Sequence, residues 1–212
     1  MFVDFDGTIT DRDTFDVLVS HFAGGDAWHA SEAGLRDGSL ALREVLQLQA
    51  SYVRGTLDEV AALLRREVRM DPAFAPFARA CLAGGIDITV VSSGLEPIVR
   101  GRLHDGGVGD IPVVANGIEV APDGWVIHFR DPVANGTDKA ALVLAAKARG
   151  RRTIFIGDGV SDYDAALVAD RRFAKAGSAL ERFLSRRGVA ATAFASFAEI
   201  RFPWRPSCLE DT

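Results

Sequence analysis

Two aspartates follow the first apolar run of the chain, and their spacing suits metal and phosphoryl chemistry. Asp4 and Asp6 stand in the segment Asp4-Phe5-Asp6-Gly7-Thr8. Side chains two apart on a strand point to the same face, so both carboxylates can approach one ligand. Such a pair can hold a hard cation, or one carboxylate can attack phosphorus while the other moves protons. Two solvated aspartates at a strand end are the plain alternative, and for this pair alone they are about as frequent.

A phosphate-binding turn is expected at Ser92, Ser93 and Gly94. These residues follow the apolar run 86–91. A hydroxyl with exposed backbone N–H groups at a strand-to-helix turn suits a phosphate. Ser-Ser-Gly is also common turn chemistry, so this signal is weak when taken alone.

A lysine and two more aspartates complete the polar set. Lys139 falls in the first turn of an expected helix, where the helix dipole disfavours a cation. That mismatch points to an anionic partner, and a solvated lysine is the alternative. The apolar run 153–156 leads into Asp158, which therefore stands at a strand end, where ligands collect in open α/β sheets. Asp162, near the start of the next helix, can be a cap, a metal ligand or a partner that supports one.

Short apolar runs alternate with helical patterns along most of the chain. Each run is closed by Gly, Ser, Asp or Asn, which is typical of strands covered on both faces. Good helix formers fill 139–149 and 162–169. The alternation predicts an α/β fold, a Rossmann-like open parallel sheet with helices on both faces. The runs expected as strands are 1–5, 86–91, 111–114, 153–156 and 172–174.

One stretch lacks a convincing strand and predicts a small helical cap inserted after the first strand. Apolar residues recur at helical spacing over 40–52 and 57–68. We therefore expect a cap at 14–70 and an α/β core formed by 1–13 and 71–212.

A β-hairpin is expected after the third strand, within 113–129. Asn116-Gly117 and Pro122-Asp123-Gly124 are turn signals, and apolar residues flank the second of them. The pattern predicts a hairpin that projects from the sheet rather than lying in it.

Composition and charge restrict the class of protein. The 212 residues are 48% hydrophobic and carry a net charge of −5, which argues against disorder and against a nucleic-acid binder with a basic stripe. No apolar run approaches the ~20 residues of a membrane helix, and the carboxylate of Asp4 comes too early for a signal peptide. Cys81, an expected buried thiol, and Cys208 lack metal-site spacing. A reducing cytoplasm is the expected compartment, and no oligomeric state is predicted.

The order of these signals resembles that of the haloacid dehalogenase superfamily of phosphohydrolases. The segment 4–8 is similar to the first motif of that superfamily, Ser92 to the second and Lys139 to the third. Asp158 with Asp162 is similar to the fourth. The resemblance spans nearly the whole chain, and the first and fourth motifs are highly specific.

The resemblance implies a phosphomonoester hydrolase that uses Mg²⁺ and acts on a small phosphorylated metabolite. Asp4 would attack the phosphoryl group and form an aspartyl phosphate. Asp6 would protonate the leaving alkoxide and then activate water. An Asp4 oxygen, the backbone carbonyl of Asp6 and Asp158 would hold Mg²⁺, with Asp162 as a direct or supporting ligand.

The resemblance also assigns the phosphate contacts. Ser92, the Ser93 amide and the adjoining Gly94 would grip phosphate oxygens, and Lys139 would offset charge around the nucleophile. Without a cation, several carboxylates and a phosphate would repel one another, so metal dependence is a physical expectation too.

The helical insertion resembles the small cap of the phosphoserine phosphatase-like branch, in which the cap supplies substrate contacts. Asp13 stands where phosphoserine phosphatases have a glutamate that reads the substrate amino group. An aspartate is one methylene shorter, which argues against phosphoserine. A closer resemblance is to methionine-salvage phosphatases acting on 2-hydroxy-3-keto-5-methylthiopentenyl-1-phosphate, in segments 4–13 and 197–201 and in the Ser-x-Gly turn. Bacterial members have cysteines before the lysine, where this chain has Ala134-Asn135-Gly136-Thr137-Asp138.

Other functions stay open at this point. A phosphoserine phosphatase or a phosphotransferase of the same fold would use the same residues. A non-catalytic module that binds a phosphorylated metabolite would be favoured by loss of Asp4 or Asp6, and both are present. A dehalogenase needs one carboxylate and no metal, so the aspartate pair argues against it.

Overall fold

A seven-stranded sheet in the order β4-β3-β2-β1-β5-β6-β7 runs through the computed structural model, which describes residues 1–22 and 39–201. The pairs β1–β2, β1–β5, β2–β3, β5–β6 and β6–β7 are parallel, and only β4 runs antiparallel to its neighbour β3. The strands are β1 Phe2–Val3, β2 Thr89–Leu95, β3 Val113–Ala121, β4 Gly124–His128, β5 Ile154–Gly157, β6 Arg171–Lys175 and β7 Thr192–Phe194.

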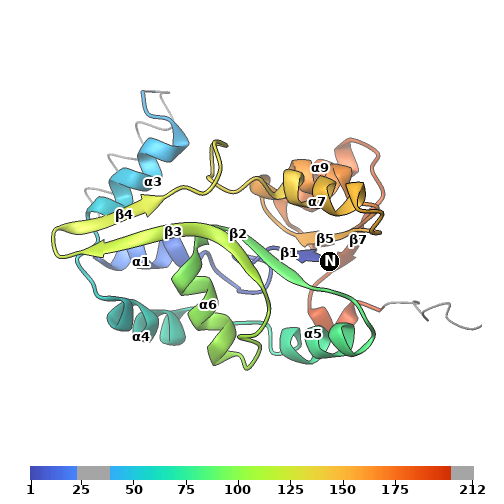
Figure 1. Cartoon of the computed structure of the whole chain (residues 1–212), viewed down its shortest axis with the longest axis horizontal. Helices are drawn as coiled ribbons and strands as arrows, with labels where there is room; N and C mark the ends of the chain where they lie inside the picture. Colours follow the sequence, from blue (N-terminus) through green and yellow to red (C-terminus); the bar gives the residue numbers. More distant parts are fainter. Residues whose placement is uncertain (23–38, 202–212) are drawn as a thin grey trace, which may run out of the picture.

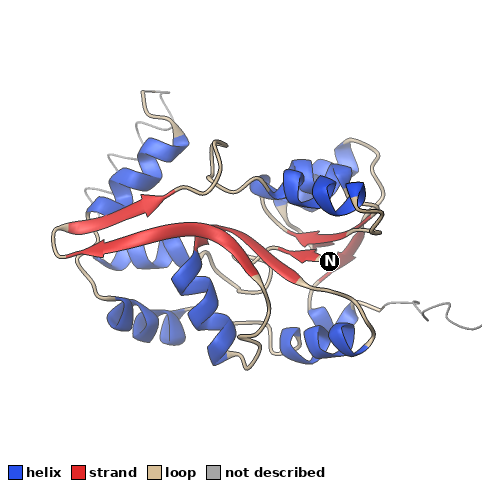
Figure 2. Ribbon diagram, in the orientation of Figure 1, coloured by secondary structure: helices blue, strands red, loops and turns tan. Residues whose placement is uncertain are grey.

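Helices cover both faces of this sheet, which confirms the predicted fold class (Figures 1 and 2). One apolar cluster packs α5 and α6 on one face, and another packs α7, α8 and α9 on the other. No helix in the described part of the chain is long and apolar enough to cross a membrane. The helices are α1 Thr14–Phe22, α3 Leu42–Ser51, α4 Leu57–Glu67, α5 Phe74–Ala83, α6 Glu96–Asp105, α7 Lys139–Ala148, α8 Tyr163–Val168 and α9 Ala179–Arg186, with 3₁₀ turns at Val160–Asp162 and Phe197–Glu199.

The expected strands exist, but their ends differ from the apolar runs. The first strand ends at Val3, because the Phe5 carbonyl accepts hydrogen bonds from the amides of Ile9 and Thr10 and closes a turn there. The second strand continues to Leu95 and so contains Ser92 and Ser93, which were expected in a turn. Strand β7 was not predicted, because its three residues make too short a pattern.

The hairpin differs from the expectation in one respect. Strand β3 pairs with β2 through Val113 and Val114 and then continues as the first strand of the hairpin, where Ile118 pairs with Ile127. The hairpin is therefore the extension of a sheet strand, and it projects beyond the parallel sheet (Figure 1). The Asn116-Gly117 turn signal was wrong, because both residues lie within β3.

The cap helices pack on this hairpin. The described part of 14–70 holds α1, α3 and α4, and residues 23–38 lie outside the described residues. A third apolar cluster joins these helices to Trp125 and Ile127 of β4 and to Leu95. The fully buried Trp125 donates from Nε1 to the Gly55 carbonyl at 2.9 Å. The hairpin thus packs with the helices of the predicted cap, although the sequence connects it to the strands of the sheet.

The first strand of the core is covered by α5, whose Cys81 is buried as predicted. Burial raises the pKa of the Cys81 thiol to about 11, so it behaves as an apolar packing group at neutral pH. Cys208 lies outside the described residues.

Trp125 provides a stability test of the cap–hairpin contact. We predict that Trp125→Ala lowers the free energy of unfolding by about 3–5 kcal/mol, because it removes a large buried aromatic side chain. Trp125→Phe keeps an aromatic ring but loses the hydrogen bond to Gly55, which should lower the free energy of unfolding by about 1–2 kcal/mol. Leu144→Ala, at a half-exposed position, is the control and should change stability by about 0.5 kcal/mol. Urea unfolding measures all three, and an unaffected Trp125→Ala variant would contradict the packing argument.

Candidate active site

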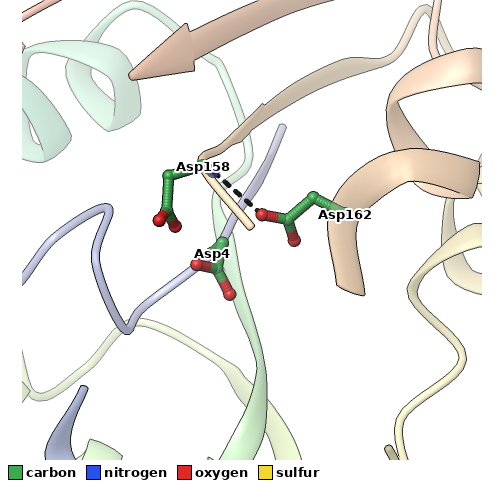
Figure 3. Close-up of side chains that lie close together, drawn as sticks. All are labelled: Asp4, Asp158 and Asp162. Carbon is green, nitrogen blue, oxygen red and sulfur yellow. Dashed lines mark hydrogen bonds between the residues drawn. The ribbon is translucent and has the colours of Figure 1, made fainter. Parts of the chain in front are cut away.

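Three carboxylates meet at the carboxyl edge of the central strands. Asp4 follows β1, Asp158 follows β5, and Asp162 ends the 3₁₀ turn after it. One oxygen of each lies within 4.8 Å of the others. Figure 3 shows the three side chains gathered from separate segments of the chain. The predicted convergence of residues that are 154 positions apart in sequence (Asp4 to Asp158) follows from the parallel pairing of β1 with β5.

Glycines let these segments approach one another. Gly7 has a φ of +77°, and a Cβ there would lie 2.5 Å from Oδ2 of Asp158. Thr8 follows and donates from its hydroxyl to Oδ1 of Asp158 at 2.8 Å. A Cβ on Gly157 would lie 2.4 Å from Oδ2 of Asp162. Any side chain at Gly7 or Gly157 would therefore displace a carboxylate of the cluster.

Asp162 is held at both of its carboxylate oxygens. Oδ2 accepts hydrogen bonds from the backbone amides of Asp158 and Gly159, each at 2.9 Å. Oδ1 accepts a bond from Nζ of Lys139 at 2.7 Å. The side chain is fully buried. Asp162 therefore fixes the turn that carries Asp158 and the ammonium that reaches Asp4.

Lys139 is buried at the first position of α7 and turns into this cluster. Its Nζ donates to Oδ1 of Asp4 at 2.5 Å, to Oδ1 of Asp162 at 2.7 Å and to the Ser161 hydroxyl at 3.1 Å. Burial alone would lower the pKa of Lys139, but the charges of Asp162 and Asp4 overcome that effect and raise it. The lysine is therefore a permanent cation, and its unfavourable place in the helix dipole is offset by two anions.

The cluster carries more negative charge than its lysine balances. Burial raises the pKa of Asp4 well above its usual range, and the charge of Asp162 adds to that effect while Lys139 opposes it. Burial likewise raises the pKa of Asp158. Three carboxylates face one ammonium among the described residues. Hard oxygen ligands with uncompensated charge are what Mg²⁺ prefers, so the residues present fit a divalent cation.

Asp6 has a different environment from the other three aspartates. Its Oδ1 accepts bonds from the amide and the hydroxyl of Thr14 at 2.8 and 2.7 Å, and its Oδ2 accepts one from the Ser92 hydroxyl at 3.2 Å. Burial raises the pKa of Asp6 to about 7, with a contribution from the charge of Asp13. A carboxyl group that titrates near neutral pH is suited to proton transfer.

Ser92 links Asp6 to the turn expected to hold phosphate. Its fully buried hydroxyl accepts a bond from the Gly94 amide at 2.8 Å while donating to Asp6. A Cβ on Gly94 would lie 2.9 Å from Oδ2 of Asp6. The two segments are therefore in close contact, and Ser93 and Gly94 border the open space in front of them.

A cavity of about 420 Å³ opens onto these residues. Asp4, Asp6, Asp13 and Asp158 line it, whereas Lys139, Ser92 and Asp162 lie behind its wall. Further walls come from α1, α3, the hairpin strands, the 3₁₀ turn after β5 and the loop before α7. A larger hollow of about 980 Å³ lies near Gly85 and Arg151, at the opposite edge of the sheet, and holds none of the residues of the acidic cluster.

Asp13, an expected substrate contact, also caps a helix. Its Oδ1 accepts hydrogen bonds from the amides of Phe15 and Asp16 at 2.8 and 3.0 Å, at the start of α1. The side chain is exposed and borders the cavity. Its position therefore allows a substrate contact from Oδ2, the carboxylate oxygen that is not bonded to the start of α1.

Asn116 was missed as a site residue. The buried side chain donates from Nδ2 to the carbonyls of Ser93 and Asn135 at 2.7 and 3.0 Å, and its Oδ1 accepts from the Arg130 amide at 3.2 Å. It thus ties the end of β2 at Ser93 to the loop that leads into α7. The only local signal at this position was the Asn116-Gly117 dipeptide, which wrongly predicted a turn.

Arg43 of α3 holds the same loop from the cap side. Its Nη1 donates to the carbonyls of Asp131 and Val133 at 2.7 and 2.8 Å, and its guanidinium lies 4.2 Å from the centre of the Phe129 ring. Thr8, Thr14 and Ser161 are further partners of the aspartates and lysine that sequence reasoning did not find.

Known proteins resemble this chain in sequence over nearly its whole length. Pdp3-interacting factor 1 of Schizosaccharomyces pombe is 33% identical, with 94% of this chain and 92% of that protein covered. Polyol phosphate phosphatase PYP1 of Saccharomyces cerevisiae is 28% identical over 94% of this chain and 90% of its own. The 2-hydroxy-3-keto-5-methylthiopentenyl-1-phosphate phosphatase of Exiguobacterium sibiricum is 27% identical over 93% and 92%.

A solved structure shares the fold of this chain, and a family match assigns the family. A substrate-bound phosphoserine phosphatase superposes with a TM-score of 0.66 at 18% identity, covering 91% of this chain and 90% of that one, which shows a shared fold. Residues 1–167 match the haloacid dehalogenase-like hydrolase family. The expected resemblance is confirmed, and the chain belongs to the haloacid dehalogenase-like hydrolase family.

Proposed function

We propose that the protein is a Mg²⁺-dependent phosphomonoester hydrolase that acts on small phosphorylated metabolites through an aspartyl phosphate on Asp4. The observation that carries this proposal is the buried Asp4 carboxylate, which Lys139 binds at one oxygen and which borders the cavity beside Asp158. A carboxylate held in one orientation next to open space is suited to nucleophilic attack.

The acidic cluster supplies candidate ligands for Mg²⁺. Asp4, Asp158 and the backbone carbonyl of Asp6 are the oxygens that we assign to it. Asp162 is a supporting residue in this proposal, because both of its oxygens are engaged by Lys139 and by backbone amides. When bound, the cation supplies positive charge that balances the carboxylates and the phosphate dianion.

The chain's own residues divide the reaction between them. Asp4 attacks phosphorus, and the bond to the leaving alkoxide breaks as the bond to the Asp4 oxygen forms. Asp6 donates its proton to that alkoxide, and the resulting carboxylate then takes a proton from the water that hydrolyses the aspartyl phosphate. The pKa of Asp6 near 7 supports both directions of transfer. Lys139 keeps Asp4 oriented throughout.

The phosphate dianion needs donors on the side away from Asp4. We assign this role to the backbone amide of Ser93, the adjoining Gly94 and the hydroxyl of Ser92. Ser93 and Gly94 border the cavity, and Ser92 fixes this end of β2 through its bonds to Gly94 and Asp6. Preorganised donors of this kind stabilise charge at the transferred group.

The names of the relatives support a small organic phosphate as substrate. Two of them are phosphatases of a polyol phosphate and of a methylthiopentenyl phosphate. The cavity of about 420 Å³ is of a size for a small metabolite rather than for a macromolecule.

Phosphate release tests the proposal. We expect turnover of small phosphate monoesters in Mg²⁺ that chelation abolishes. Asp4→Asn removes the nucleophile and should leave no measurable turnover, and Asp6→Asn should lower kcat by roughly 10²–10⁴ because it removes the proton donor. Asp164→Asn changes an exposed aspartate of α8 and is the matched control with unchanged kcat. Turnover that survives in Asp4→Asn would contradict the assignment of the nucleophile.

The same assay separates the alternatives. A phosphotransferase would form a phosphorylated product only when an acceptor other than water is added. A non-catalytic module would bind esters and Mg²⁺ without releasing phosphate from any of them.

The raised carboxyl pKa values predict how stability depends on pH without metal. The folded state holds protons on Asp6, and on Asp4 and Asp158, at pH values where the unfolded chain has released them. The folded state therefore binds more protons, and stability falls as pH rises between the two pKa values. Urea unfolding in a chelator should give a free energy about 2–3 kcal/mol lower at pH 8 than at pH 5 from Asp6 alone. Asp6→Asn should reduce this dependence of stability on pH, and so should Mg²⁺. Higher stability at pH 8 than at pH 5 in chelator would contradict the raised carboxyl pKa values.

A further inference from the structure

The cavity extends beyond the acidic cluster to a side-chain amide that the proposed mechanism does not use. Asn135 lines the cavity, and its side chain has no hydrogen-bond partner among the described residues. We infer that the site selects phosphate monoesters with an uncharged leaving group, and that the amide of Asn135 reads a hydroxyl or carbonyl oxygen of that group. This inference rests on the proposed function and names its substrate class.

Asn135 is held in place by its backbone. Its carbonyl accepts a bond from Nδ2 of Asn116 at 3.0 Å. Gly136 follows with a φ of +78°, and a Cβ there would lie 2.4 Å from Oδ1 of Asn116. Arg43 binds two carbonyls of the same loop from the cap. A rigid loop that presents a free amide, with two donors and one acceptor, can recognise an uncharged oxygen.

Apolar side chains form the wall beside this amide. Leu42 and Leu46 come from α3, Ile127 from β4 and Phe129 from the segment after it. The carbon chain of a leaving group would pack against these side chains. A charged group on that chain would lose its water here without gaining a partner. The wall therefore favours uncharged groups.

The opening of the cavity repels carboxylates. Asp11 and Asp13 precede α1 and line it. Arg12 is the one basic side chain among the described lining residues, and it is directed to Glu67, 3.4 Å from the carbonyl and 3.9 Å from a carboxylate oxygen. A leaving-group carboxylate would meet like charges instead of an arginine free to bind it in two places.

Three matched esters test the selectivity. Erythritol phosphate carries hydroxyls, erythronate phosphate replaces one end with a carboxylate, and butyl phosphate has the same number of carbons without hydroxyls. With Mg²⁺, we expect kcat/KM for erythritol phosphate to be at least about tenfold above that for erythronate phosphate. Equal or higher kcat/KM for the carboxylate would overturn the inference.

Substitution of Asn135 tests the reading residue. Asn135→Ala should lower kcat/KM for erythritol phosphate about tenfold, the equivalent of one lost hydrogen bond of about 1.4 kcal/mol. It should leave butyl phosphate within about twofold, which a general loss of structure would not do. Asn135→Asp keeps the size and should lower kcat/KM for erythronate phosphate further. An equal loss on the butyl and erythritol esters would contradict a role in recognition.

Binding measurements keep this inference separate from the proposed function. Calorimetry on Asp4→Asn with the same esters and Mg²⁺ gives affinities without turnover. The expected order is the same, with erythritol phosphate bound more tightly than erythronate phosphate. If the wild type hydrolyses no ester, the proposed hydrolase is wrong, but these affinities still test the selectivity. Tighter binding of erythronate phosphate than of erythritol phosphate would overturn the inferred selectivity.

Discussion

The buried ammonium of Lys139 is the constraint on which the site depends. It holds Asp4 and Asp162, which are 158 positions apart in the sequence, and both carboxylates are buried. Removal of one member of such a group leaves uncompensated buried charge, which costs far more than an exposed ion pair contributes. The sheet topology places the three segments together, and the lysine makes their arrangement specific. Among the described residues three carboxylates share this one ammonium, and the unbalanced carboxylates are the physical reason for the proposed cation.

The molecule separates chemistry from selectivity. The acidic cluster lies on the rigid parallel sheet, and close-packed glycines fix its geometry. The cavity wall comes from cap helices and from the hairpin, which pack as one apolar cluster. Asn116 and Arg43 hold the loop between these two parts, one from each side. Changes in the wall can thus alter the preferred leaving group while the reacting residues stay in place.

Sequence reasoning succeeded where a local pattern implied a position at a strand end. Asp4 and Asp158 were predicted at strand ends, which share one edge in a parallel sheet, and they lie together. Lys139 was predicted in the first turn of a helix with an anionic partner, and its Nζ binds Asp4. It failed where function depends on contacts between distant backbone groups. The role of Asn116 requires the carbonyls of residues 93 and 135, which no local pattern brings together. The hairpin was expected, but its packing against α3 is tertiary and could not be read from turn signals.

The central claim is that Asp4, oriented by Lys139, receives the phosphoryl group. Mass spectrometry of acid-quenched enzyme tests it most directly, since an acyl phosphate survives brief acid treatment. Asp6→Asn, mixed with substrate and Mg²⁺, should slow hydrolysis of the intermediate and show a phosphoryl adduct on the peptide that contains Asp4. An adduct on another residue would contradict the account. So would turnover without any adduct that inverts the configuration at phosphorus, because two successive displacements through Asp4 would retain it.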